Sequence, residues 1–287
     1  MNGTAPDRRL RILTLNAWAL PISVPGHDKR ARTARLPEAL RAIDADIIVL
    51  QEAFDTNVRR AVIDALRDQY HVAEDALEIR RALGISFDVH GGILVLSRFD
   101  LGDTHFRPHP LPPGSKFSER LGRKGTVFST VKTVVGDLKL VAPHFYAGTS
   151  PADQRIRRLQ VEALINSIEE LDHGPVILAG DLNFPPERYD DGRASEMDLI
   201  LAAGFRDTIE PSNGHQPATW SYSRNRYVRN RLQTHKSDMR FDYVMFRPNG
   251  ASKVKAISAS IVLDAPGEEV SDHYGVLAEF SMSGLSS

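Results

Sequence analysis

Short apolar segments that stop at a polar residue are the feature that most constrains how this sequence can fold. Residues 10–15, 47–50 and 176–179 are rich in Leu, Ile and Val. These runs are too short for helices and are bounded by turn-forming residues, so they predict buried strands. The polar residues at or beside the ends of these and two later strands are Asn16, Glu52, Asp181, Asn183, Asp242, Asp272 and His273.

Each of these polar residues by itself is typical of an ordinary turn, because Asp and Asn are turn formers. Their number favours a second interpretation, in which the sheets bring the strand ends together into one pocket. Carboxylate and amide oxygens suit Mg²⁺, which also contacts substrate phosphate in such sites, with Mn²⁺ as the ion that could replace it. The sequence has no Cys, which excludes disulfides, thiolate metal sites and a cysteine nucleophile.

Amphipathic segments separate several of these strands. Helices are predicted over 30–43, 56–69, 152–171 and 194–203, and Pro37 is expected in the first turn of its helix. Further strands are predicted at 92–97, 127–135, 138–143, 241–246, 258–263 and 275–280, with Gly136-Asp137 as a hairpin turn. This mixed order indicates an α/β protein (α+β in some schemes) with two packed sheets and helices outside. Residues 98–122 and 206–240 are expected to be long loops.

The overall charge and hydropathy exclude some classes of protein. A net charge of −1 gives no support to a strongly basic nucleic-acid binder. No apolar run approaches the roughly 18–20 residues that span a bilayer, so lipid contact is expected at the membrane surface only. The first residues lack the apolar core of a signal peptide. We therefore expect a cytoplasmic or membrane-peripheral protein, or a secreted one if a signal peptide has been removed.

The motifs at the strand ends resemble those of the endonuclease/exonuclease/phosphatase superfamily, in the same order along the chain. They are 15–18 (LNAW), 50–52 (LQE), 180–183 (GDLN), 241–244 (FDYV) and 271–273 (SDH). The resemblance implies a four-layer αββα sandwich with a metal-dependent phosphodiester site at the sheet edge. It also implies a single catalytic domain over 10–281, with tails at 1–9 and 282–287, and a monomer is expected.

Within the superfamily, the sequence is most similar to the neutral sphingomyelinases. Residues 15–22 (LNAWALPI) and 46–54 (DIIVLQEAF) resemble their N-terminal signature, and 122–127 (GRKGTV) resembles their Lys-Gly segment. Residues 144–147 (HFYA) resemble their His-Leu-His-Ala segment, with Tyr146 in place of the second His and Pro143 where Thr is usual.

The resemblance implies a role for each candidate residue. Glu52 is the main metal ligand, supported by Asn16 and Asp272. Asp181 and Asn183 orient the attacking water and contact the phosphoryl group. His273 is the general base, Asp242 fixes its tautomer, and His144 stabilises developing charge.

Lys124 and the segment 219–240 are the expected substrate contacts. Lys124 is placed to reach a phosphate or to steer Asp181, and a solvated loop lysine is the alternative. The segment 219–240 interleaves aromatic residues with arginines, which suits either a lipid headgroup or nucleic-acid bases. Trp220 and Tyr222 are its expected substrate-binding residues, and an exposed loop whose arginines pair with acids is the alternative.

The leading hypothesis is an Mg²⁺-dependent phosphodiesterase that hydrolyses sphingomyelin, or a related choline phospholipid, to ceramide and phosphocholine. Two enzyme alternatives remain: a nuclease of the same superfamily, or an inositol-phosphate phosphatase. A non-catalytic binding protein on this fold would be expected to lack at least one metal or base residue, and the sequence retains all of them.

Overall fold

The computed structural model describes residues 8–23, 27–73, 79–82, 85–88, 91–171, 174–184, 195–209, 216–229, 236–249 and 254–283. Two six-stranded mixed sheets dominate these residues. The first has the strand order β13-β14-β1-β2-β6-β3, and the second has the order β11-β12-β10-β9-β8-β7. A separate hairpin pairs β4 with β5.

The strands of the first sheet are β1 (Arg8–Asn16), β2 (Ile47–Gln51), β3 (His71–Val72), β6 (Leu94–Ser97), β13 (Val254–Val262) and β14 (Gly275–Met282). Those of the second sheet are β7 (Leu101–Pro108), β8 (Gly125–Thr133), β9 (Gly136–Pro143), β10 (Val176–Asp181), β11 (Arg206–Asp207) and β12 (Asp242–Arg247). The small hairpin comprises β4 (Ile79–Ala82) and β5 (Ile85–Asp88). The helices are α1 (Lys29–Ile43), α2 (Thr56–Leu66), α3 (Phe117–Gly122), α4 (Pro151–Glu169), α5 (Glu196–Ala202) and α6 (Arg226–Arg229).

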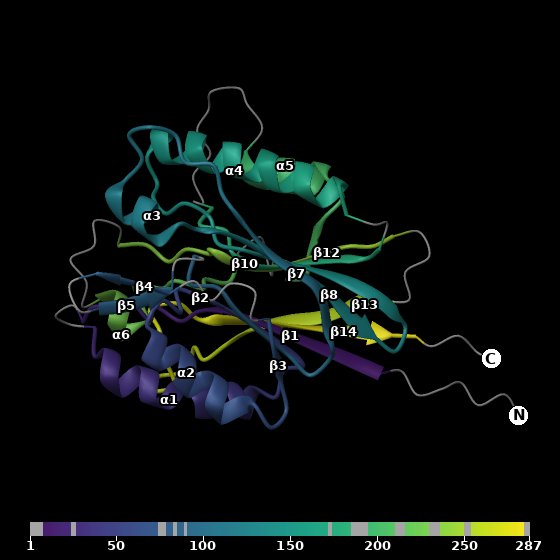
Figure 1. Cartoon of the computed structure of the whole chain (residues 1–287), viewed down its shortest axis with the longest axis horizontal. Helices are drawn as coiled ribbons and strands as arrows, with labels where there is room; N and C mark the ends of the chain where they lie inside the picture. The colour runs from purple at the N-terminus through teal and green to yellow at the C-terminus, as the bar shows by residue number, and fades with distance from the viewer. Residues whose placement is uncertain are drawn as a thin grey trace, which may run out of the picture.

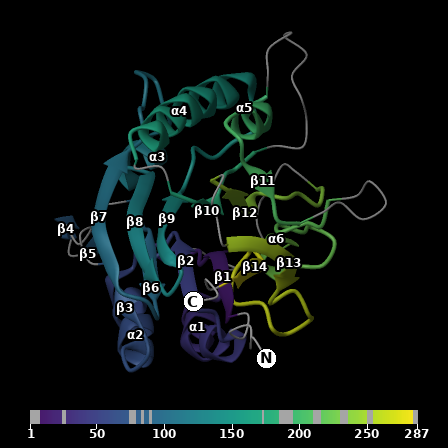
Figure 2. The same cartoon turned by 90° about the vertical axis from the view of Figure 1, so that its right-hand side faces the viewer.

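The two sheets pack face to face between two helical layers, which confirms the predicted αββα sandwich (Figure 1). Apolar side chains from both sheets fill the centre, among them Ile12, Val49, Ile177 and Val244. On the outer face of the first sheet, α1 and α2 contribute Leu36 and other apolar residues to a second core. Helices α4 and α5 cover the other sheet from the opposite side of the molecule (Figure 2).

The central strands of both sheets carry the polar motifs at their ends. In the first sheet β1 and β2 run parallel, with Asn16 opposite Gln51. In the second sheet β10 and β12 are antiparallel, with Asp181 opposite Asp242. Gly180 is required at this point, because a Cβ there would lie 2.1 Å from the carbonyl oxygen of Pro143. The glycine therefore lets β10 pass close to the end of β9.

Two local predictions were wrong. Pro37 lies in the interior of α1 and not in its first turn, because the helix begins at Lys29. Pro37 has no backbone N–H to donate within the helix, and the buried side chains of Leu36 and Leu40 hold the helix against the sheet on either side of it. The β8–β9 hairpin exists, but its turn is Val134-Val135, and Gly136 already pairs with Thr133 at a φ of 116°.

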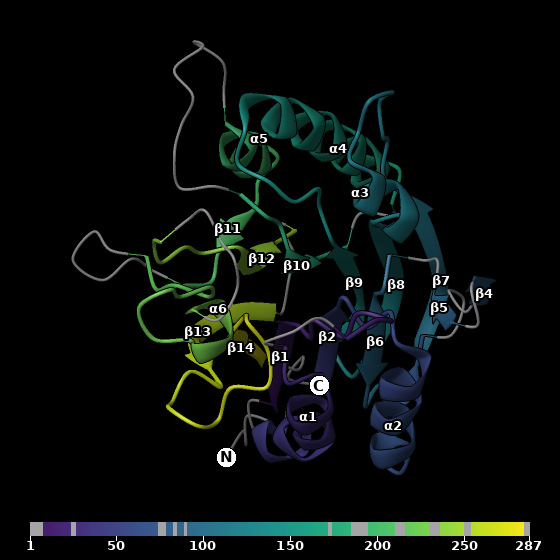
Figure 3. The same cartoon turned by 90° about the vertical axis from the view of Figure 1, so that its left-hand side faces the viewer.

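The two stretches expected to be long loops contain regular structure. Residues 98–122 include the eight-residue strand β7 and the six-residue helix α3. Residues 206–240 include the short elements β11 and α6. Both α3 and α6 lie at the end of the molecule where β1 and β10 finish, on opposite sides of those strand ends (Figure 3).

Candidate active site

The two sheets are joined at their polar ends by a direct side-chain contact. Asn16, at the end of β1, donates from Nδ2 to Oδ2 of Asp181 at 2.9 Å, and both side chains are almost fully buried. The Oδ1 atom of Asn16 accepts the backbone N–H of Trp18 at 2.9 Å. Asn16 thus fixes the carboxylate of one sheet against the strand end of the other.

Several site residues follow their strands in a left-handed backbone conformation. Glu52 and Asn183 each have φ 52°, and Trp18 has φ 47°. Non-glycine residues rarely adopt this conformation, and its cost is tolerated where the surroundings hold the residue in place. Asn183 is held by its own N–H to Asp181 Oδ1, at 2.9 Å, and by its side-chain amide to Phe145 O, at 3.0 Å.

His273 and Asp242 form a buried pair. The Nδ1 atom of His273 lies 2.8 Å from Oδ2 of Asp242, which is fully buried on β12. This contact directs the Nδ1 proton to the carboxylate and leaves Nε2 as the nitrogen that can accept a proton. The structure therefore brings together the predicted base and the residue predicted to fix its tautomer.

His144 lies between two carboxylates without a hydrogen bond to either. Its Nε2 atom is 3.6 Å from Asp181 Oδ2 and 3.9 Å from Glu52 Oε1, and the side chain is fully buried. Burial, followed by the charge of Lys124, holds the pKa of His144 well below its usual range. The ring is thus a neutral imidazole that retains one N–H for donation.

The carboxylates at the strand ends perturb one another strongly. Burial and the neighbouring Asp242 raise the pKa of Asp181 to about 7. Burial lowers the pKa of His273, but the charge and hydrogen bond of Asp242, with Asp181 and Asp272 nearby, raise it to about 10. At both residues the neighbouring carboxylates favour the protonated form, but burial adds to the rise in the pKa of Asp181 and opposes the rise in the pKa of His273.

The negative charge of these carboxylates fits a metal ion. Asp181, Asp242 and His273 each offer a ligand atom within 4.8 Å of the other two, so this group could hold a cation. Asp242 Oδ1 is buried without a hydrogen-bond partner in the described part of the chain. Glu52 adds a carboxylate with 20% of its side chain exposed, and Asp272 adds a buried one. Oxygen-rich sets of this kind favour hard cations such as Mg²⁺.

Lys124 is connected to this cluster of carboxylates through Phe145, whose backbone N–H donates to Asp181 O. Its ammonium donates to Glu119 Oε1 at 3.1 Å and to Phe145 O at 3.2 Å, and the residue is only 6% exposed. Phe145 O also accepts from Asn183. Lys124 is therefore a buried, paired cation and not a solvated loop lysine. Its charge helps to lower the pKa of His144 and limits the rise in the pKa of Asp181.

The model of the endonuclease/exonuclease/phosphatase family matches residues 13–273. This span includes each polar strand end described above. The chain belongs to the endonuclease/exonuclease/phosphatase family. The superfamily resemblance predicted from the motifs is thereby confirmed.

The curated relatives of this family member include two sphingomyelinases from Leptospira interrogans. Sphingomyelinase C 2 is 31% identical over 105 residues, which is 32% of this chain and 16% of that protein. Sphingomyelinase C is 22% identical over 203 residues, which is 63% of this chain and 35% of that protein. The chain thus spans about a third or less of the length of these relatives.

Solved structures share the fold over nearly the whole chain. Sphingomyelinase C from Streptomyces griseocarneus superposes with a TM-score of 0.68 at 17% identity, covering 95% of this chain and 99% of that one. TDP2 from D. rerio, complexed with a single-strand DNA product, gives 0.67 at 19% identity and covers 96% and 99%. Because the two scores are nearly equal, the fold does not distinguish a lipid from a DNA substrate.

The described parts of the segment 219–240, which are residues 219–229 and 236–240, contribute buried side chains to the fold. Trp220 is 4% exposed and packs in a small apolar cluster with Phe241, at 6.2 Å between ring centroids, and with a partly buried Tyr222. Two of its arginines pair with acids: Arg240 with Asp207, through bonds of 2.7 and 2.8 Å, and Arg224 with Asp264, at 3.1 Å. Arg231 and His235, which belong to the same basic segment, lie outside the described residues.

Two buried residues that support the site were missed from the sequence. The guanidinium of Arg32 on α1 donates to Ala17 O at 2.8 Å and to Val270 O at 3.2 Å, and it also bonds Trp18 O. It thereby joins the loop after Asn16 to the loop before Asp272. Asn225, buried beside α6, donates to Ser271 O at 3.0 Å. Helical spacing in a basic segment gives no signal for such long-range contacts.

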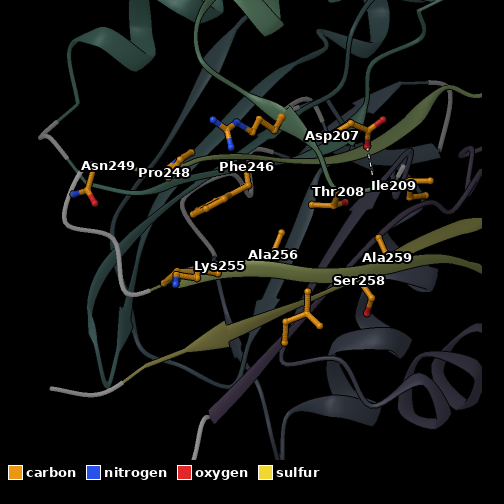
Figure 4. Close-up of a pocket in the computed structure, with 13 residues that line it drawn as sticks. Asp207, Thr208, Ile209, Phe246, Pro248, Asn249, Lys255, Ala256, Ser258 and Ala259 are labelled. Atoms are coloured by element: carbon orange, nitrogen blue, oxygen red, sulfur yellow. Dashed lines mark hydrogen bonds between the residues drawn. The ribbon is translucent and has the colours of Figure 1, made fainter. Parts of the chain in front are cut away.

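A groove of about 630 Å³ lies elsewhere, between the edge strands of the two sheets (Figure 4). Phe246 and Thr208 line one side of it, and Lys255, Ala256 and Ser258 on β13 line the other. None of the site residues lines this groove, so it is separate from the candidate active site. Among the described residues, no helix is both long enough and apolar enough to cross a bilayer.

Proposed function

We propose that this chain is a divalent-metal-dependent phosphodiesterase that hydrolyses sphingomyelin or a related choline phospholipid, releasing phosphocholine and leaving ceramide. The observation that carries the phosphodiesterase chemistry is the meeting of Asp181 on β10, Asp242 on β12 and His273 just before β14, which each offer a ligand atom within 4.8 Å of the other two. Mg²⁺ is the proposed ion, with Mn²⁺ able to replace it, and Glu52, Asn16 and Asp272 are its proposed ligands. Asp181 lies beside them through its bond to Asn16.

When bound, the metal ion would polarise a phosphoryl oxygen and offset charge during in-line displacement. His273 in its neutral form takes the proton of the attacking water at Nε2, because Nδ1 is committed to Asp242. The positive charge of a bound ion would favour that neutral form, since it would offset the carboxylates that raise the pKa of His273. Asp181 and Asn183 orient that water and the phosphoryl group. His144 donates its remaining N–H to a phosphoryl oxygen in the gap between Asp181 and Glu52.

The lipid substrate is supported by two separate lines. The curated relatives are sphingomyelinases, and the Lys124 segment resembles that of neutral sphingomyelinases. The basic segment 219–240 is the main argument for a nuclease. Two of its arginines pair with Asp207 and Asp264, so their charges are already neutralised within the protein. Peripheral contact with a membrane surface follows from the proposed substrate. Because the structurally similar TDP2 from D. rerio is complexed with a single-strand DNA product, nuclease activity is the alternative that the experiment must test.

The test is release of phosphocholine from sphingomyelin vesicles in Mg²⁺, in Mn²⁺ and after chelation. Glu52→Gln and His273→Ala should each lower the rate at least about a hundredfold. Glu268→Gln and His71→Ala are matched controls, because both residues are exposed, and these variants should keep the wild-type rate. The proposal is wrong if the protein cuts single-stranded or plasmid DNA in Mg²⁺ but releases no phosphocholine. Phosphate release from an inositol phosphate would point to the phosphatase alternative.

A further inference from the structure

Helix α3 exposes large apolar side chains next to the candidate site. Phe117 is 79% exposed and Leu121 is 51% exposed, whereas Glu119 on the opposite side of the helix is buried. Residues four apart lie on the same face of a helix, so the two apolar side chains form one continuous patch. Single exposed apolar residues are common, whereas apolar side chains grouped on one face and rimmed by polar residues are typical of an interaction surface.

Basic side chains surround this apolar patch. Lys116 precedes the helix, Arg120 lies within it and Arg123 follows it. Lys116 pairs with Asp153 at 3.0 Å, while Arg120 and Arg123 have no ion pair within the part of the chain that the structure describes. Apolar residues flanked by unpaired arginines match the boundary between acyl chains and phosphate headgroups.

We propose that the outer face of α3, comprising Phe117, Leu121, Arg120 and Arg123, docks the protein on a phospholipid bilayer surface. Phe117 and Leu121 enter the headgroup region, and the arginines contact lipid phosphates. The proposal deepens the proposed function, on which it rests for the substrate within that bilayer. Attachment to the bilayer itself does not require hydrolysis.

A short chain of contacts connects this face to the candidate site. Glu119, on the buried side of α3, bonds the ammonium of Lys124 at 3.1 Å. Lys124 bonds Phe145 O, which also accepts from Asn183. The helix C-terminus packs near Phe54, two residues after Glu52. A bilayer held by α3 would therefore lie beside the Lys124–Asn183 side of the site, where a lipid headgroup has to arrive.

The first test measures co-sedimentation with phosphatidylcholine vesicles, with and without phosphatidylserine, in chelator so that no lipid is hydrolysed. Phe117→Ser/Leu121→Ser should weaken binding at least about tenfold. Val134→Ser/Leu201→Ser is the matched control, because these residues are 58% and 47% exposed and lie on other elements. Its affinity should stay at the wild-type value. Equal binding by both double variants, or no vesicle binding by the wild type, overturns the proposal.

A second measurement reports insertion directly. The native Trp18 and Trp220 are buried, at 1% and 4% exposure, so a new tryptophan on α3 dominates the vesicle-dependent change in emission. Phe117→Trp should shift its emission to the blue when vesicles are added, and Val134→Trp should not. An unshifted Phe117→Trp spectrum overturns the proposal even if the serine variants misfold. If α3 variants lose single-stranded DNA binding instead, the face serves a nucleic acid.

Hydrolysis of a small water-soluble phosphodiester separates this proposal from the proposed function. Phe117→Ser/Leu121→Ser should hydrolyse it at the wild-type rate, because neither residue touches the candidate site. If Glu52→Gln leaves lipid hydrolysis unchanged, the proposed function fails while the vesicle-binding result still decides the role of α3. If the serine variant loses activity on the soluble diester as well, its loss of vesicle binding reflects damage to the site and contradicts specific docking.

Discussion

Two segments of this protein combine aromatic and basic residues, and they use them in opposite ways. In the segment 219–240, Trp220 and Tyr227 are buried and two arginines bond Asp207 and Asp264. In the segment 116–124, Phe117 is 79% exposed and Arg120 has no ion pair with any described residue. Helices α3 and α6, which belong to these two segments, lie at the end of the molecule where β1 and β10 finish (Figure 3).

Two segments of similar composition can therefore serve different purposes, one in packing and the other at the surface. In 219–240 Trp220 packs against Phe241 and Tyr227 packs against Trp18, and Arg240 and Arg224 pair with nearby acids. These contacts stabilise the fold beside Asp242 and Asp272. In 116–124 only Glu119 faces inward among the helical residues, and the other side chains remain available to a partner. Substitutions in 219–240 should therefore affect stability, and substitutions in 116–124 should affect binding.

The largest expected difference is between Trp220→Ala and Phe117→Ala. Removing the buried indole should lower the free energy of unfolding by about 3–5 kcal/mol, because it leaves a cavity beside Phe241. Removing the exposed ring of Phe117 should change it by less than about 0.5 kcal/mol. Urea unfolding of both variants checks this. Similar losses of stability would mean that the two segments do not differ in packing.

A smaller effect is expected from the buried histidine beneath the 116–124 segment. The backbone N–H of His109 donates to Lys124 O at 3.0 Å. Burial, and after it the charge of Lys124, lowers the pKa of the His109 ring to about 3. Because the folded pKa lies below the unfolded value of about 6.5, the unfolded state binds the proton first. Stability is therefore lost as the pH falls from 6.5 towards 3.

Between pH 7 and pH 5 this single group should cost about 2 kcal/mol of unfolding free energy. His109→Gln cannot take up the proton, so its stability should fall by that much less over the same interval. Lys124 and His144 also lie near this ring, and both are unchanged in the variant, so their contributions cancel in the comparison. Identical pH dependence in the two proteins would show that His109 is not buried in its neutral form.

The sequence-based predictions succeeded where the evidence is local. Apolar runs predicted the central strands, and polar residues at their ends predicted the meeting of Asn16, Asp181, Asp242 and His273. The same reasoning could not predict α3, because the six residues of that helix are too few to show a helical period. It also could not predict whether Trp220 faces inward, because that depends on contacts with Met239 and Phe241.

The supporting residues escaped prediction for a related physical reason. Arg32 acts through carbonyl groups at positions 17, 18 and 270, so its role depends on sequence separations of up to 238 residues. Glu119 is five residues before its partner Lys124, yet only the fold shows that both are buried. A residue's type indicates its chemistry, but its partners come from the topology.

The smallest expected difference compares one arginine from each segment. Arg120→Gln removes a charge from the proposed docking face and should weaken binding to phosphatidylserine-containing vesicles by about 1 kcal/mol, which is about fivefold. Arg224→Gln removes a charge that is paired with Asp264 and should leave that affinity unchanged. Raising the salt concentration should reduce the gap between wild type and Arg120→Gln, because screening weakens contacts with anionic lipid. If Arg224→Gln weakens binding more than Arg120→Gln does, the segment 219–240 is the membrane-facing one.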